Sequence, residues 1–115
     1  MEKRKHARIN SNTEVHISDQ AGFCTGTLKD FSRFGLCITD LPRRIHTENG
    51  FFEAIFTCSD LKFKLLVEEK WIKTEGLANM VGAVIDNASW NWTEMVMQHE
   101  SVDDDVWGNQ QLLHA

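Results

Sequence analysis

The feature that most constrains the fold is a series of short runs of β-branched and aromatic residues, separated by residues that favour turns. Helices need longer runs with a period of 3.6 residues, whereas runs of about 4–8 alternating or continuously apolar residues are typical of strands. About six such runs at short intervals indicate a mostly β protein built as a small barrel or sandwich. The predicted strands are Thr13–Ser18, Phe23–Leu28, Gly35–Thr39, Phe51–Cys58, Lys62–Lys73 and Met80–Ile85.

Three of the intervening segments have the composition of turns or loops. Asp19–Gly22 is predicted to be a turn, and Ser59–Asp60 a hairpin turn between two strands. The polar stretch Pro42–Gly50 begins with the only proline of the chain and is predicted to be a loop.

The C-terminal part has a different pattern. Asn91 followed three positions later by Glu94 resembles a capping box, which marks the start of a helix. Apolar and aromatic side chains then recur at the spacing of one helix face. We expect a short amphipathic helix that packs this face over one end of the barrel. The face consists of Trp92, Met95, Val96 and His99.

The size of the chain fits one domain with a hydrophobic core. It has 115 residues, of which 42% are hydrophobic and 25% are charged. No apolar run approaches the ~18–20 residues that span a membrane, and no apolar segment of a secretory signal follows the first charged residues. The three cysteines are widely spaced and form no CxxC pair, which favours reduced, buried thiols in a cytoplasmic protein. They are Cys24, Cys37 and Cys58.

The net charge of −5 hides an asymmetry. The first ten residues contain four Lys or Arg and one Glu, whereas residues 65–115 contain nine acidic and two basic residues. A basic arm on an acidic protein argues against general nucleic-acid coating and fits a small anion that is bound locally. Taken alone, the cluster is better explained by a solvated, flexible terminus. We expect a flexible basic arm over 1–12, a barrel with its helix over 13–99 and an acidic tail over 100–115.

Two short motifs carry the chemistry. Arg4-Lys5-His6-Ala7-Arg8 is an RxxxR, and Asp30-Phe31-Ser32-Arg33-Phe34-Gly35 is a [D/N]xSxxG. Each is weak alone, but their order, their separation of about twenty residues and the strands around them are specific together. They resemble the PilZ domain, a bacterial receptor family for cyclic di-GMP, and the resemblance covers roughly residues 3–99.

The resemblance implies a six-stranded antiparallel split β-barrel with a C-terminal helix. It also implies that cyclic di-GMP lies between the basic arm and the barrel surface that bears the second motif. Lys3 and Lys5 add positive charge there, while Arg33 either contacts phosphate or is solvated, and both interpretations stay open. The strand Gly82–Ile85 departs from the family by ending in an aliphatic residue instead of an aromatic one. The residues that match the ligand-binding motifs are Arg4, Arg8, Asp30, Ser32 and Gly35.

The chemistry of these side chains suits that ligand. A guanidinium donates in parallel to O6 and N7 of guanine, stacks on the purine or pairs with phosphate, and a lysine does the first two poorly. The carboxylate of Asp30 accepts hydrogen bonds from the Watson–Crick edge of guanine, and Ser32 offers a hydroxyl. Gly35 allows either a close backbone approach or an otherwise forbidden dihedral. Without the two arginines, a polar turn would be the simpler interpretation of Asp30–Ser32.

Other function classes have less support. The histidines show no HxxxH spacing, Asp103–Asp105 lacks the pattern of a calcium loop, and neither a G-x-S-x-G elbow nor a P-loop occurs. We therefore expect no enzyme, cofactor or metal, and no membrane insertion. The expected function is a single-domain cyclic di-GMP receptor that signals through its ordered arm to a separate protein.

Two binding modules remain as alternatives. One is a PilZ-like scaffold for protein interactions that needs no nucleotide. The other is a barrel for single-stranded nucleic acid, against which the acidic second half of the chain argues.

Overall fold

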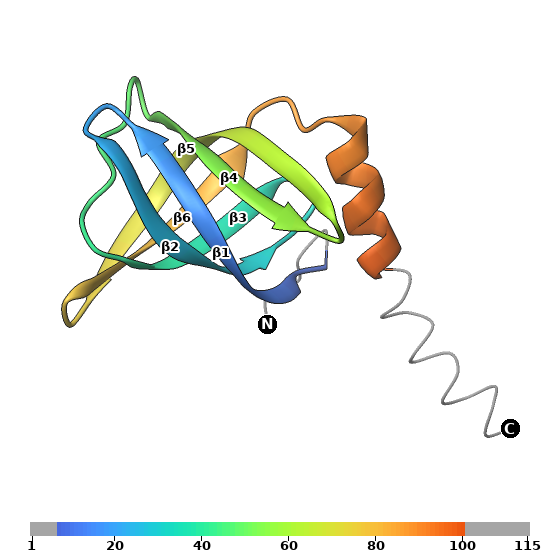
Figure 1. Ribbon diagram of the computed structural model, residues 1–115, viewed down its shortest axis with the longest axis horizontal. Helices are drawn as coiled ribbons and strands as arrows, with labels where there is room; N and C mark the ends of the chain where they lie inside the picture. Colours follow the sequence, from blue (N-terminus) through green and yellow to red (C-terminus); the bar gives the residue numbers. More distant parts are fainter. Residues whose placement is uncertain (1–6, 101–115) are drawn as a thin grey trace, which may run out of the picture.

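The computed structural model describes residues 7–100. Six strands pair antiparallel throughout and close into a barrel in the order β1-β2-β3-β6-β5-β4 (Figure 1). A helix occupies residues 90–100 and lies against the end of the barrel at which β4 ends. The predicted antiparallel barrel and its C-terminal helix are confirmed. The strands are β1 (Ile9–Asp19), β2 (Gly22–Phe31), β3 (Gly35–Leu41), β4 (Phe51–Cys58), β5 (Leu61–Glu75) and β6 (Ala78–Ile85).

The barrel interior is filled by every second side chain of the strands. Along β4 the buried positions are Phe52, Ala54 and Phe56, and their exposure does not exceed 3%. This alternation follows from the pleat, because successive side chains of a strand point to opposite faces of the sheet. Ile85, the aliphatic end of β6, is also buried, so it fills core space at that position.

The basic arm is shorter than predicted. β1 begins at Ile9, which pairs with Phe31 and is only 8% exposed, so residues 9–12 belong to the barrel. The polar composition of this stretch concealed the strand, because its pairing partner lies on β2 and not beside it in the sequence. At the other predicted boundary, Glu100 lies within the helix, and residues 101–115 of the predicted acidic tail lie outside the described residues.

The Ser59–Asp60 turn is confirmed. Both residues have positive φ, 53° and 64° respectively, which is the conformation that a two-residue hairpin turn requires. Aspartate tolerates this region better than most residues, and serine is also found in turns.

The Pro42–Gly50 loop is held to the barrel by a buried carboxylate. The side chain of Asp19, at the end of β1, is fully buried and accepts hydrogen bonds from Arg43 Nη1 at 2.7 Å and Nη2 at 2.9 Å. It also accepts the backbone N–H of His46 at 2.8 Å and of Ala21 at 3.0 Å. The Arg43 guanidinium, helped by the two backbone donors, lowers the pKa of Asp19 to about 2.

The helix begins two residues earlier than the predicted capping box. Ser89 precedes the helix, and its Oγ accepts a hydrogen bond from the backbone N–H of Trp92 at 3.2 Å, so Ser89 and not Asn91 is the N-cap. The predicted apolar face is confirmed, since Met95 and Val96 are buried with Trp92. The Trp92 ring is completely buried among three aromatic rings of the barrel, with ring centroids 5.1–5.7 Å apart. Within residues 7–100 no helix is long and apolar enough to cross a membrane.

Candidate ligand-binding site

The barrel brings the two sequence motifs together. Arg8 directly precedes β1 and Asp30 lies near the end of β2, and these two ends pair through Ile9 and Phe31. Arg8 Nη1 donates a hydrogen bond to Asp30 Oδ1 at 2.8 Å, with 40% of the arginine and 16% of the aspartate side chain exposed. The pair orients a guanidinium at the barrel surface. Of the other predicted basic residues, Lys3, Arg4 and Lys5 lie outside the described residues.

The second motif forms a tight connection between β2 and β3. The backbone N–H of Ser32 donates to the carbonyl of Gly35 at 2.9 Å, and the N–H of Ile85 donates to the carbonyl of Phe34 at 2.8 Å. A Cβ on Gly35 would lie 3.2 Å from the carbonyl oxygen of Ala83, and Gly35 is not among the residues with positive φ. The absence of a side chain on Gly35 therefore eases the close packing of β3 on β6, and its dihedral angle is an ordinary one.

A shallow hollow of about 240 Å³ lies across β3, β6 and β5 next to these motifs. From the predicted site, Arg8, Ser32 and Gly35 line it, while Asp30 lies beside it and holds Arg8. The hollow thus combines the guanidinium of Arg8, the hydroxyl of Ser32 and the backbone of Gly35.

Two further residues of the hollow, Lys70 and Trp71, were not predicted from the sequence. Trp71 pairs with Gly82 across β5 and β6, and a Cβ on Gly82 would overlap the indole ring, so the ring lies directly over the glycine. A register shift between Glu69 and Trp71 changes the direction of the side chains at this point. The indole is 45% exposed and forms a flat aromatic surface beside Arg8. A tryptophan near the end of the predicted strand Lys62–Lys73 was the signal available in the sequence, but its position over Gly82 depends on the cross-strand register.

Arg33 does not line the hollow. Its guanidinium pairs with the carboxylate of Glu100, and Nη2 donates to Oε1 at 2.8 Å. This hydrogen bonding to Glu100 raises the pKa of Arg33 above its usual value.

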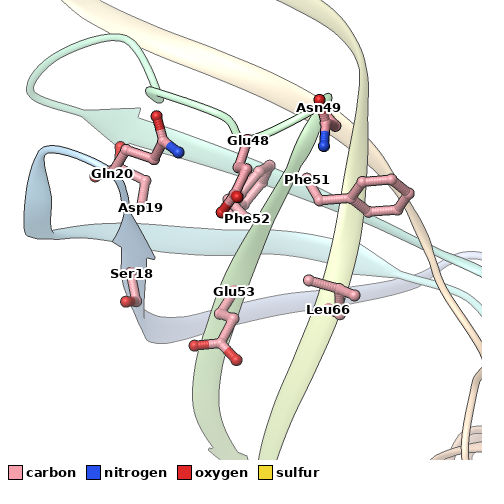
Figure 2. A pocket seen from close by; sticks show the side chains of 9 residues that line it. All are labelled: Ser18, Asp19, Gln20, Glu48, Asn49, Phe51, Phe52, Glu53 and Leu66. Atoms are coloured by element: carbon pink, nitrogen blue, oxygen red, sulfur yellow. The ribbon is translucent and has the colours of Figure 1, made fainter.

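A second hollow, of about 540 Å³, has a different character. It lies between the end of β1 and the start of β4 and contains no residue of either motif (Figure 2). Glu48 and Glu53 line it together with Phe51 and Leu66, and the carboxylate of Asp19 is already bonded to Arg43. Its carboxylates would repel an anionic ligand, so the smaller hollow beside Arg8 is the better candidate for an anion.

The cysteines offer no activated nucleophile. Cys37 is buried, as predicted. Cys24 and Cys58, which were also predicted to be buried, are half-buried. Burial raises the pKa of all three thiols, which keeps them protonated near neutral pH. Within residues 7–100 no group of three His, Cys, Asp or Glu side chains is placed to hold a metal ion.

Comparison with known proteins identifies the fold. No family model and no curated protein matches the sequence. Among solved structures, the PilZ domain of YcgR from Escherichia coli, determined with c-di-GMP, superposes with a TM-score of 0.71 at 11% identity. The alignment covers 96% of this chain and 98% of that domain. The chain has the PilZ fold.

Two longer proteins have the same fold over part of their length. The Bacillus subtilis inhibitor of motility, MotI/DgrA, matches with a TM-score of 0.71 at 10% identity, over 86% of this chain and 50% of that one. MrkH from K. pneumonia in its apo state matches with a TM-score of 0.68 at 9% identity, over 96% and 55%. The chain therefore spans about half the length of these two proteins. At such identities the likeness is one of fold, and the ligand must be inferred from the residues of the site.

Proposed function

We propose that this chain is a receptor for cyclic di-GMP and that the ligand binds in the hollow beside Arg8. The observation that carries the proposal is the Arg8–Asp30 pair, which joins the two motifs on the surface that Ser32 and Gly35 also line. The similar PilZ domain of YcgR, whose structure contains c-di-GMP, supports this choice of ligand.

The side chains of the hollow complement the parts of the ligand. Cyclic di-GMP has two guanines and two phosphodiesters, each with one negative charge. Arg8, held in place by Asp30, presents a planar fork that suits the O6/N7 edge of guanine or a phosphate. Lys70, whose Nζ pairs with Glu68 Oε1 at 3.1 Å, also lines the hollow. The exposed face of Trp71 offers a surface on which a purine can stack. Arg4 adds the second guanidinium of the RxxxR motif.

Isothermal titration calorimetry with cyclic di-GMP, cyclic di-AMP and a short single-stranded oligonucleotide tests the ligand class. We expect binding of cyclic di-GMP and a much weaker signal with the other two. Arg8→Ala should weaken binding by about 1–3 kcal/mol, the range of a good bidentate contact to guanine. Arg44→Ala is the matched control, because Arg44 is exposed, does not line the hollow and lies in neither motif.

The alternatives correspond to other outcomes of the same titration. Preference for the oligonucleotide would favour a single-stranded nucleic-acid barrel. Absence of binding to all three ligands would favour a nucleotide-independent scaffold for protein interactions. Wild-type affinity in both Arg4→Ala and Arg8→Ala would show that the site lies elsewhere.

The proposed output is binding to a separate protein, with no catalytic step. Residues 1–8 contain few apolar side chains, so they bury too little surface to offset the ~1–2 kcal/mol per residue that ordering the backbone costs. Cyclic di-GMP would supply the missing charged and stackable partner and order the arm against the barrel. Amide hydrogen exchange over residues 2–8 should slow when the ligand is added. Strong protection of these amides without ligand would contradict this signalling model.

A further inference from the structure

The C-terminal helix is hydrogen-bonded to the second motif at one residue, Arg33. Arg33 Nε donates to Glu100 Oε1 at 3.2 Å and Oε2 at 3.1 Å, and Nη2 donates to Oε1 at 2.8 Å. The carboxylate of Glu100 is only 14% exposed, so this ion pair is better shielded than an ordinary surface pair. Arg33 is adjacent to Ser32, which lines the hollow.

A second bond joins the same helix to the backbone of the motif. The indole Nε1 of Trp92 donates to the carbonyl of Arg33 at 3.0 Å, and Trp92 is completely buried in the core. The position of the Arg33 backbone is therefore set by the core, whereas its side chain is held by a partly exposed ion pair. The bond to Trp92 uses the carbonyl of Arg33, and the bonds to Glu100 use its guanidinium.

We propose that Glu100 competes with cyclic di-GMP for Arg33, so that ligand binding releases the end of the helix from the motif. The proposal rests on the proposed function. A phosphodiester offers two oxygens to the planar guanidinium fork, as a carboxylate does, so Arg33 can exchange one acceptor pair for the other. Arg33 would then have two states, paired with Glu100 without ligand and paired with phosphate when the ligand is bound. The pairing with Glu100 replaces the solvated side chain that was one of the two interpretations from the sequence.

The competition couples the ligand site to the helix in both directions. The free energy that holds Arg33 to Glu100 must be overcome by the ligand, so weakening the ion pair strengthens ligand binding by the same factor. Ligand binding in turn leaves the residues around Glu100 less firmly held to the second motif. The helix then becomes a second element, besides the N-terminal arm, whose state depends on the messenger.

Glu100→Gln tests this coupling, because it removes the charge and keeps the shape of the side chain. In calorimetry we expect its affinity for cyclic di-GMP to rise about fivefold or more, the lower end of typical coupling factors. Glu94→Gln is the matched control, since Glu94 is an exposed acid on the same helix with no hydrogen bond to Arg33 among the described contacts. Its affinity should stay within about twofold of wild type. In an Arg33→Met background, Glu100→Gln should no longer raise the affinity.

Hydrogen exchange gives an independent measurement. Amides of residues 97–100 should exchange faster in wild type when cyclic di-GMP is added, and faster in Glu100→Gln even without ligand. Wild-type affinity in Glu100→Gln, or slower exchange of these amides on ligand binding, would overturn the competition while leaving the receptor function intact. If wild type and Glu100→Gln both fail to bind cyclic di-GMP, the receptor function itself is wrong, and the competition with it.

Discussion

Substitution of Asp19 by asparagine should reveal how strongly one buried carboxylate holds the Pro42–Gly50 loop. The asparagine would keep the size of the side chain, but its amide N–H₂ would face one N–H of Arg43 and one backbone N–H that now donate to a carboxylate oxygen of Asp19. The lowering of the Asp19 pKa from 3.8 to about 2 reflects how much the folded protein favours the ionised carboxylate over the protonated one. At about 1.4 kcal/mol per pKa unit, Asp19→Asn should lower the free energy of unfolding by about 2 kcal/mol. That corresponds to a fall in Tm of roughly 10 °C for a domain of this size.

The pH dependence has a definite sign. The folded state depresses the pKa of Asp19, so the stabilisation is fully present above the unfolded value of 3.8 and is lost as the pH falls toward about 2. The difference between wild type and Asp19→Asn should therefore be constant from pH 7 to about pH 5 and shrink below about pH 4.

Urea unfolding at a series of pH values measures this difference directly. Asp60→Asn serves as the control, because Asp60 is exposed in the β4–β5 turn and asparagine tolerates its φ of 64° as well as aspartate does. An Asp19→Asn protein within about 0.5 kcal/mol of wild type at pH 7 would refute the reasoning. A difference that stays constant through the acid range would also refute it.

Three further outcomes are expected. Arg8→Lys keeps the charge but loses the planar fork, so it should lose much of the affinity for cyclic di-GMP in calorimetry; near-wild-type affinity would show that simple charge attraction dominates. Trp71→Ala should weaken binding by about 1–3 kcal/mol if a base stacks on the indole, and Trp71→Phe should remove the ligand-induced change in tryptophan fluorescence while retaining part of the affinity. Ser89→Ala should lower the free energy of unfolding by about 0.5–2 kcal/mol through loss of the N-cap, as measured by urea denaturation; a neutral result would mean that the Ser89–Trp92 bond does not stabilise the helix start.

The residues that form local patterns were predictable from the sequence. All six strands, the Ser59–Asp60 turn and the buried helix face follow from periodicity and turn chemistry, which act over a few residues. The predicted ends of the strands and of the helix were less accurate, because local patterns do not include partners that lie far away in the sequence. The polar start of β1 is a strand because Ile9 pairs with Phe31, and the helix starts directly after Ser89 because its hydroxyl reaches the N–H of Trp92.

The residues of the candidate site were predictable to a similar extent. Arg8, Asp30, Ser32 and Gly35 could be named from the sequence because they lie in two short motifs, each with its own spacing. That Arg8 bonds to Asp30 was decided by the pairing of β1 with β2, which closes a separation of 22 residues.

The sequence by itself determined the class of fold and the residue types of the candidate site, because periodicity, turn residues and motif spacing are properties of neighbouring positions. Only the tertiary structure decided that Trp71 lies over Gly82 and that Arg33 bonds to Glu100 across 67 positions. Both contacts depend on strand register and on how the helix packs against the barrel. These are set by the burial of the whole core, so no short stretch of sequence contains them.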